Sequence, residues 1–301
     1  MDDELKQKVA IAIERLKAFE PQEGFHLAFS GGKDSVTLKA LADMAGVKYK
    51  AVYRVTGIDP PELVKFIKQH HPDVKFDIPR YKDGRRITMW NLITTKQIPP
   101  TRLARYCCQQ LKESSGDGKM CLTGVRWAES TARKANQGVA TVMAKRKSNQ
   151  ELVDSGNFRS TNRGGVVLVN DNEGSRRMLE SCYKRQKTTI NPIIDWTDND
   201  VWNFIRGYNV PYCSLYDEGF ERIGCIGCPV AGKKNREIEF ARWPKFKNLY
   251  MLAFDKMVKA REKAGKEARG WQTAQDVFNW WMEYDILPGQ TSLFEDGGED
   301  A

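Results

Sequence analysis

Six consecutive residues, Ser30 to Ser35, combine the groups that bind phosphate. This S-G-G-K-D-S stretch follows an apolar run, Phe25 to Phe29, and precedes a helical pattern. Two adjacent glycines, Gly31 and Gly32, let successive backbone N–H groups converge on an oxyanion at the start of the helix. Lys33 adds a full positive charge. The order of strand, glycine turn and helix therefore predicts a phosphate-binding loop.

The side chains of the loop extend this prediction. The hydroxyls of Ser30 and Ser35 can bond phosphate oxygens, and Asp34 can cap the helix or hold a magnesium ion. We expect Lys33 and Asp34 to be catalytic. The signature G-x-x-x-x-G-K-[ST] is absent, which argues against a Walker-type NTPase.

Four cysteines form a second constellation, in which the pair Cys107-Cys108 precedes Cys225 and Cys228 by more than a hundred residues. A C-x-x-C in a glycine-flanked turn lets two thiolates face one ion or cluster, and a remote pair can complete four ligands. Zinc is an alternative, but adjacent cysteines suit a zinc knuckle poorly, and four buried reduced thiols are a third interpretation. We favour a four-iron four-sulfur cluster.

The other cysteines carry less chemistry. Cys182 is an alternative ligand that could replace Cys107 or Cys108, Cys121 lies in an expected strand, and Cys213 lies in an expected loop. Whether three or four cysteines bind the cluster stays open.

The composition indicates the class of protein and the kind of partner. The 301 residues are 41% apolar and 29% charged, as in ordinary globular proteins, and the net charge of +9 favours polyanionic partners such as nucleotides or nucleic acids. No apolar stretch reaches membrane-spanning length and no signal-peptide pattern is seen, so we expect a cytoplasmic protein without a membrane partner. Cysteines in that compartment indicate metal binding, redox chemistry or burial.

Strand-like and helix-like segments alternate along the chain. After the loop, a helix should end at Gly46, and strands are expected over Tyr49 to Val55, Val74 to Ile78 and Met120 to Val125. This alternation predicts an α/β fold with a doubly wound, mainly parallel sheet. Ligands of such sheets bind beyond the carboxyl ends of the strands. The turns Thr56-Gly57 and Thr123-Gly124 should therefore join the glycine loop at one site.

We expect two domains. Residues 1–230 form the nucleotide-binding α/β domain, with a polar insertion or cover near 135–177 that contains a hairpin across Val166 to Val169. Residues 231–301 form a C-terminal helical region. Its aromatic residues recur at helical spacing, which favours packing over base stacking.

The loop resembles the PP-loop superfamily, whose members carry S-G-G-x-D-S and bind the phosphates of ATP or a related adenine nucleotide. Further motifs narrow the resemblance to the phosphoadenosine phosphosulfate (PAPS) reductase family, with matches over about residues 24–230. The matching pieces are Ser30 to Ser35, Thr56-Gly57 with Pro61-Glu62, Arg105 to Cys108, Gly124-Val125-Arg126 with Glu129-Ser130 and Arg133, Asn191-Pro192-Ile193, and Leu215-Tyr216 with Gly219-Phe220 before Gly224-Cys225.

This resemblance implies roles for individual residues. Arg126 and Arg133 would face the phosphate or sulfate end of the ligand, and Arg126 joins the catalytic set. The cysteine pattern is similar to that of cluster-bearing adenylyl-sulfate reductases. The expected nucleotide contacts are Ser30, Gly31, Gly32, Lys33, Asp34, Ser35, Thr56, Gly57, Gly124, Arg126 and Arg133.

One departure bears on the reaction. Reductases of this family use a cysteine in a C-terminal tail as the nucleophile, whereas no cysteine follows Cys228 here. A first interpretation is therefore an enzyme that takes ATP, releases pyrophosphate and activates an acceptor, such as tRNA or DNA, for transfer of sulfur from a donor. A second is a PAPS or adenylyl-sulfate reductase that uses a partner's thiol. A third is a nucleotide-binding regulatory subunit without turnover.

Overall fold

Contacts divide this chain into two compact units. The structure is a computed structural model that describes residues 3–113, 116, 118–143, 149–182, 187–266 and 270–284. We call the first of the two compact units the sheet unit; it is made of Met1–Val55, Pro61–Asp77 and Ser114–Ile223. We call the second the helical unit, made of Thr56–Pro60, Ile78–Glu113 and Gly224–Ala301.

The sheet unit contains an eight-stranded sheet in the order β3-β2-β1-β4-β8-β5-β7-β6. The first five strands of that order pair in parallel, and β5, β7 and β6 continue the sheet antiparallel. The sheet is therefore mixed but mainly parallel, which confirms the predicted fold class. The strands are β1 (Phe25–Ala28), β2 (Tyr49–Arg54), β3 (Lys75–Asp77), β4 (Met120–Leu122), β5 (Ala140–Met143), β6 (Phe158–Ser160), β7 (Val166–Leu168) and β8 (Lys187–Ile190).

Local sequence explains the parallel part. β1 carries Phe25 and Leu27, both buried, and the glycine loop leads directly into the helix α2 (Lys33–Ala45). Gly46 ends α2 in the left-handed conformation, with φ at 69°, as glycine after a helix commonly does. The predicted end of this helix is confirmed.

The segment 135–177 is not a cover, as we expected, but part of the sheet. It supplies β5, β6 and β7, and Val142, Leu152 and Val166 are fully buried. Its many polar residues occupy the turns, which masked the short apolar strands in the sequence. The hairpin prediction is confirmed, because β6 and β7 pair antiparallel across Val166 to Leu168.

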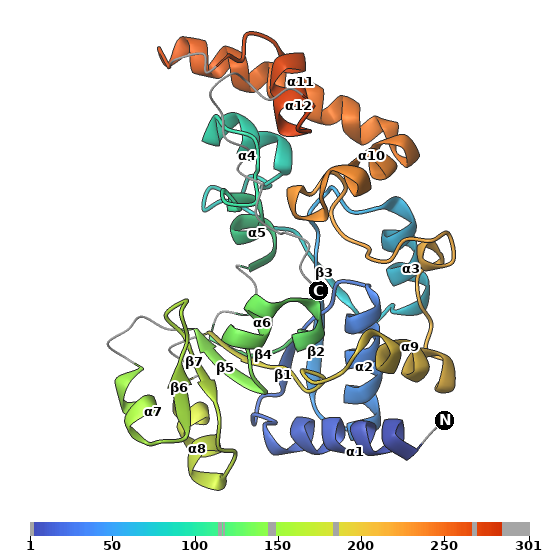
Figure 1. The fold of residues 1–301 in the computed structure, drawn as a ribbon, viewed down its shortest axis with the longest axis vertical. Coiled ribbons are helices and arrows are strands. Elements are labelled where there is room, and N and C mark those ends of the chain that lie inside the picture. Colours follow the sequence, from blue (N-terminus) through green and yellow to red (C-terminus); the bar gives the residue numbers. More distant parts are fainter. Residues whose placement is uncertain are drawn as a thin grey trace, which may run out of the picture. The chain divides into compact units, whose positions relative to one another are not determined.

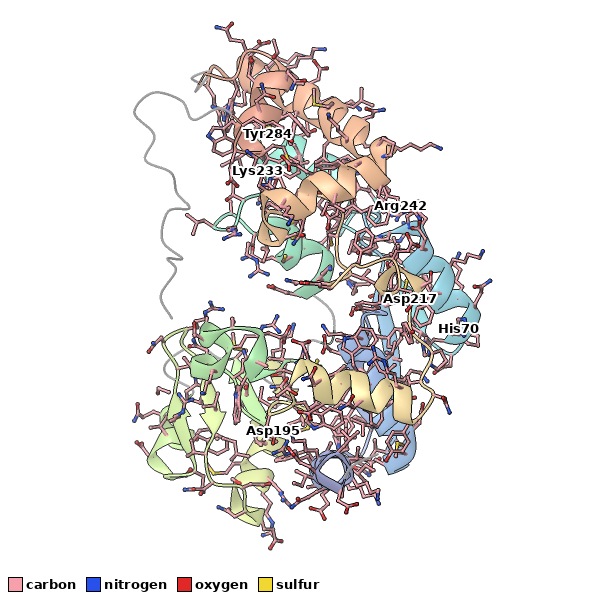
Figure 2. All side chains as sticks on the ribbon, turned by 45° about the vertical axis from the view of Figure 1, so that its right-hand side comes forward. His70, Asp195, Asp217, Lys233, Arg242 and Tyr284 are labelled. Carbon is pink, nitrogen blue, oxygen red and sulfur yellow. The ribbon has the colours of Figure 1, made fainter. Side chains whose placement is uncertain are left out.

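Helices α1, α2 and α9 lie side by side in the sheet unit (Figure 1). Two contacts fix α1 against the segment that begins α9: Arg15 binds Asp195 (labelled in Figure 2) through two nitrogens at 2.9 Å, and Lys8 binds Asp200 at 2.9 Å. The helices of this unit are α1 (Asp3–Ala18), α2, α3 (Pro61–His70), α6 (Thr131–Asn136), α7 (Gln150–Asp154), α8 (Glu173–Cys182) and α9 (Asp198–Gly207), with 3-10 turns η2 (Trp127–Glu129) and η4 (Ser214–Tyr216).

The helical unit packs around aromatic side chains. Tyr250, Phe254, Phe278 and Trp281 are buried there, which confirms the packing interpretation. At its surface Lys233 lies over the ring of Tyr284, 4.9 Å from the centroid (Figure 2). Its helices are α4 (Met89–Lys96), α5 (Tyr106–Cys108), the π-helix η1 (Gln109–Glu113), η5 (Pro229–Ala231), α10 (Lys233–Arg242), α11 (Pro244–Lys263) and α12 (Ala274–Trp281).

The predicted domain boundary near residue 230 and the two units do not coincide, because 56–60 and 78–113 group with the C-terminal helices. The boundary between folding domains stays a prediction. Residues 285–301 of the predicted helical region lie outside the described residues. No helix among the described residues combines the length and the apolarity that crossing a bilayer requires.

Candidate functional site

The glycine loop turns sharply at Gly31. Its φ is +78°, and a Cβ there would lie 2.8 Å from the terminal methyl carbons of Leu63 and Ile67 on α3. Both the backbone conformation and the lack of space therefore require glycine at this position. The next residue, Gly32, is the N-cap of α2 and makes no side-chain capping bond, a feature of helix starts that bind anions.

The hydroxyls of the loop bond to the loop itself. Ser30 Oγ lies 3.2 Å from Ser35 Oγ and accepts a bond of 3.4 Å from the N–H of Gly32. Ser35 Oγ donates to the carbonyl oxygen of Gly32 at 2.9 Å. These contacts hold the turn in shape, which prepares its N–H groups for an anion.

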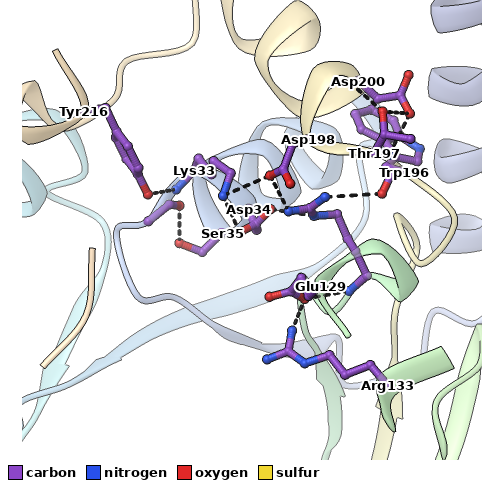
Figure 3. A network of polar contacts seen from close by, with 12 residues as sticks. Lys33, Asp34, Ser35, Glu129, Arg133, Trp196, Thr197, Asp198, Asp200 and Tyr216 are labelled. Carbon is purple, nitrogen blue, oxygen red and sulfur yellow. Dashed lines mark hydrogen bonds and ion pairs between the residues drawn. The ribbon is translucent and has the colours of Figure 1, made fainter. Parts of the chain in front are cut away.

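Tyr216 closes one side of the loop. Its phenol oxygen accepts a hydrogen bond of 2.9 Å from the N–H of Lys33 (Figure 3). The ring packs edge-on against Trp202 of α9, 5.0 Å between centroids. Burial raises the pKa of Tyr216, so the phenol stays protonated and can also donate a hydrogen bond. We did not single out Tyr216 as a site residue from the sequence.

Two cations meet the carboxylate of Asp198 beside the loop. Lys33 Nζ lies 3.2 Å and Arg126 Nη2 lies 2.9 Å from Asp198 Oδ1. Arg126 Nε also donates to Asp34 Oδ1 at 2.7 Å, and its side chain is only 1% exposed. Figure 3 shows this network between the ends of α2 and α9. The structure thus brings all three expected catalytic residues, Lys33, Asp34 and Arg126, to one place.

Asp198 is the functional candidate that sequence reasoning missed. The residues around it form a helix cap, in which Thr197 and Asp200 exchange backbone-to-side-chain hydrogen bonds at the start of α9. Burial alone would raise the pKa of Asp198, but the charges of Arg126 and Lys33 outweigh it and lower the pKa. The capping motif fixed the helix start and gave no sign of these two partners.

Gly124 lies against the loop. A Cβ on Gly124 would lie 3.0 Å from Cβ and the carbonyl oxygen of Asp34, so the close approach needs glycine. Arg133, expected to face the ligand, pairs with Glu129, and the same Glu129 accepts a 2.9 Å bond from the N–H of Arg126. The contact of Arg133 with a ligand stays a prediction.

Thr56 and Gly57 fall in the helical unit and not in the unit that contains the loop. The buried Thr56 hydroxyl lies 2.7 Å from Asp59 Oδ2, and Cys225 Sγ lies 3.6 Å from Asp59 Oδ1. Asp59 therefore connects this turn to the cysteines. The meeting of Thr56-Gly57 with the loop stays a prediction.

The C-x-x-C turn is held by α10 and α11. Gly227, with φ at +73°, has no room for a Cβ, which would lie 2.7 Å from Phe240 Cζ and 2.9 Å from Tyr250 Cε2. Its N–H donates to Glu239 Oε2 at 2.7 Å, and the Tyr250 hydroxyl donates to the carbonyl of Ile226 at 3.0 Å. The positions of Cys225 and Cys228 are therefore set by tertiary contacts.

Cys107 and Cys108 differ in acidity. The hydrogen bond from Cys107, together with Arg105, lowers the pKa of Cys108 to about 5, and Arg105 Nη2 lies 3.5 Å from its sulfur. The same hydrogen bond, burial and the charges of Cys108, Cys225 and Cys228 raise the pKa of Cys107. Burial raises the pKa of Cys225 to about 12, against the charge of Lys112. The four thiols are thus close enough to influence one another.

Cys107, Cys108, Cys225 and Cys228 offer four thiols, which are the ligands typical of an iron–sulfur cluster. Among the described residues no three His, Cys, Asp or Glu side chains are arranged to hold a single metal ion. Arg105 and Lys112 supply positive charge beside the thiols, which a cluster with four thiolates needs because its net charge is negative.

The other three cysteines belong to the sheet unit. Cys121 and Cys213 are buried in the sheet unit. Cys182 ends α8 in the same unit, and its side chain lies outside the described residues, so its role as an alternative ligand stays a prediction.

Comparison with known proteins identifies a family. Residues 24–231 match the family described as "Phosphoadenosine phosphosulfate reductase domain". An uncharacterized protein of Methanocaldococcus jannaschii is 26% identical over 238 residues, which cover 79% of this chain and 47% of that protein. Adenosine 5'-phosphosulfate reductase of Neisseria meningitidis is 47% identical over 53 residues, 18% of this chain and 22% of the reductase. The chain thus spans about half or less of these relatives.

Two solved structures share parts of the fold at low identity. The phosphate complex of PAPS reductase from Candida auris has a TM-score of 0.42 and 13% identity, covering 75% of this chain and 96% of the reductase. The U34-tRNA thiolase of Methanococcus maripaludis with its 4Fe-4S cluster has a TM-score of 0.40 and 12% identity, covering 88% of this chain and 83% of the thiolase.

Proposed function

The chain belongs to the phosphoadenosine phosphosulfate reductase domain family, and we propose that it is an enzyme of sulfur metabolism that uses ATP or a related adenine nucleotide. In this proposal it activates an acceptor, tRNA or DNA, for sulfur transfer and releases pyrophosphate. An iron–sulfur cluster takes part.

This proposal rests on the positions of Lys33 and Arg126 beside the start of α2. A helix start with two cations beside it is suited to the phosphates of a nucleotide. The two cations already share the carboxylate of Asp198, and both also pair with Asp34. A phosphate oxygen would take over the position of the Asp198 carboxylate.

The expected reaction needs no protein nucleophile. An acceptor oxygen attacks the α-phosphorus of ATP, the bond from that phosphorus to the bridging oxygen breaks, and pyrophosphate leaves. Lys33 and the loop N–H groups would stabilise the charge on the departing pyrophosphate, with a magnesium ion held by Asp34. A sulfur donor then displaces AMP from the acceptor and forms the carbon–sulfur bond.

The cluster would be held by Cys107, Cys108, Cys225 and Cys228. With three of these four cysteines as ligands, the cluster would supply one iron to which sulfur can attach. Glu239 and Tyr250 fix the turn between the last two cysteines, and Arg105 donates toward the sulfur of Cys108. These contacts orient the thiols before any cluster is assembled.

Measuring pyrophosphate release tests the proposal. The wild type should release pyrophosphate from ATP in the presence of an acceptor, and Lys33→Ala should lower the rate at least about tenfold because a phosphate-binding charge is lost. Lys65→Ala, which removes an exposed lysine of α3, is the matched control. If Lys33→Ala leaves the rate unchanged, the loop is not the nucleotide site.

Sulfonucleotide reduction is the second candidate, favoured by the short but high identity to adenosine 5'-phosphosulfate reductase. In this candidate the thiol that takes the sulfo group comes from a partner. Sulfite release from PAPS or adenylyl sulfate with thioredoxin, and no pyrophosphate from ATP, would select this reaction. Nucleotide binding with neither product would select a regulatory subunit.

A further inference from the structure

One face of the parallel sheet carries a row of basic residues. His26 of β1 stands opposite Lys50 of β2, and Val52, two residues along the same strand, stands opposite Lys75 of β3. Side chains two apart in a strand share a face. His26, Lys50 and Lys75 therefore project from the same side of three neighbouring strands.

These residues line a large open cavity of about 780 Å³. Lys119, immediately before β4, joins them at the wall. Tyr49 and Lys119 stand at the amino ends of β2 and β4, whereas Ser30 follows the carboxyl end of β1. The cavity and the glycine loop are therefore separate sites of the sheet unit. The lining residues are His26, Tyr49, Lys50, Ala51, Val52, Asp73, Lys75, Asp77, Gly116 and Lys119.

The charge of the cavity is positive. Its two carboxylates are each paired with a cation outside the lining: Asp73 with Lys39 at 3.1 Å, and Asp77 with Arg54. The three lysines of the wall are exposed, and within the described part of the chain they form no ion pair. They are Lys50, Lys75 and Lys119. The cavity thus has three positive charges that pair with no carboxylate among the described residues.

The pKa of His26 is affected by the positive charges around the cavity. Burial, followed by the charges of Lys119 and Lys187, lowers its pKa to about 4. The ring is therefore neutral at physiological pH and carries one N–H group, which is compatible with an anion beside it. The cavity is suited to a ligand with several negative charges.

The length of this row of basic residues suits a linear polyanion. From β4 through β1 and β2 to β3 there are three strand spacings, or about 14 Å. One strand of a nucleic acid duplex places about four phosphates along that length, at roughly 3.4 Å each along the axis. We propose that Lys50, Lys75 and Lys119 bind the phosphodiester backbone of a nucleic acid. The choice of a nucleic acid over other polyanions rests on the proposed function, in which the acceptor is tRNA or DNA.

Fluorescence anisotropy with a labelled single-stranded DNA oligonucleotide, and competition by total tRNA, tests this proposal. The variant has Lys50→Ala, Lys75→Ala and Lys119→Ala. The matched control removes three exposed lysines elsewhere, by Lys17→Ala, Lys65→Ala and Lys256→Ala. Both variants lose the same net charge, so their difference measures the surface itself.

The cavity variant should bind the probe at least about tenfold more weakly. The salt dependence should weaken: the magnitude of the slope of log affinity against log salt concentration, between about 50 and 200 mM, should decrease by about 2 to 3, because three phosphate contacts are lost. The control variant should retain most of its affinity. Equal weakening of both variants would overturn the proposal, and so would lysine-dependent binding of inorganic tripolyphosphate with no binding of either nucleic acid.

A third measurement separates this inference from the proposed function. The cavity variant should bind pyrophosphate as the wild type does, which also shows that it is folded. Lys33→Ala should lose pyrophosphate binding and keep nucleic acid binding. Retained pyrophosphate binding by Lys33→Ala would refute the nucleotide site. Unchanged nucleic acid binding by the cavity variant would refute the backbone surface.

Discussion

Lys33 Nζ lies 3.2 Å from a carboxylate oxygen of Asp198, so a residue far along the chain neutralises the lysine of the glycine loop. The same oxygen accepts from Arg126. A phosphate that binds these cations must compete with Asp198. The competition is a property of the site that can be measured.

Asp198→Asn should strengthen pyrophosphate binding. The amide keeps the shape but removes the competing charge, and a partly exposed ion pair of this kind contributes about 0.2–1 kcal/mol, which corresponds to an affinity gain of up to about fivefold. Isothermal titration calorimetry at neutral pH measures the change. Asp195→Asn, at the Arg15 pair, is the control. Weaker binding by Asp198→Asn would show that the carboxylate assists the ligand instead.

The cysteine site predicts an iron–sulfur protein. After anaerobic purification the wild type should be brown and contain about four iron and four sulfide ions per chain. Cys225→Ser with Cys228→Ser should be colourless, whereas Cys121→Ser, a change of a buried cysteine in β4, should keep the colour. Iron and sulfide analysis with the visible absorption spectrum measures this. Stoichiometric zinc in a colourless wild type would refute the assignment.

Two glycines beside Cys225 should differ in their tolerance of a side chain. Gly227→Ala should lower the free energy of unfolding by about 2–3 kcal/mol, because its φ is +73° and the new Cβ would meet Phe240 and Tyr250. Gly224→Ala is the control, since no atom lies within 4 Å of its Cβ position. Urea unfolding curves compare the two. Equal effects would mean that α10 and α11 do not clamp the turn.

Acid should destabilise the sheet unit through two buried histidines. Burial, reinforced by nearby lysines, lowers the pKa of His26 and of His71 to about 4, against about 6.5 in the unfolded chain. The unfolded chain therefore takes up more protons between these values, so stability is full above pH 6.5 and is lost as the pH falls toward 4. Each histidine should contribute about 1–2 kcal/mol of loss at pH 5 relative to pH 7.

Unfolding in urea at both pH values measures this loss. His71→Gln should reduce the difference between pH 7 and pH 5, and His70→Gln, a change of the exposed neighbour, should not. A stability that does not change between these pH values would contradict the lowered pKa values.

The sequence by itself determined the parts that depend on neighbouring residues. The strand before the loop, the glycine turn, the end of α2 at Gly46 and the cap at Thr197 all follow from local backbone preferences, and all are present. The family motif at Ser30 to Ser35 is local in the same sense. Short apolar strands among polar turns, as in 135–177, lack such a signal, and there the prediction of a cover was wrong.

The tertiary structure decided which distant groups share a site. Asp198 and Tyr216 reach Lys33 only because α9 and the turn after it pack beside α2, and Asp59 reaches Cys225 only within the helical unit. The basic row exists because strand register places His26, Lys50 and Lys75 on one face. Charge pairing and register arise between segments far apart in the chain, so spacing along the sequence does not encode them.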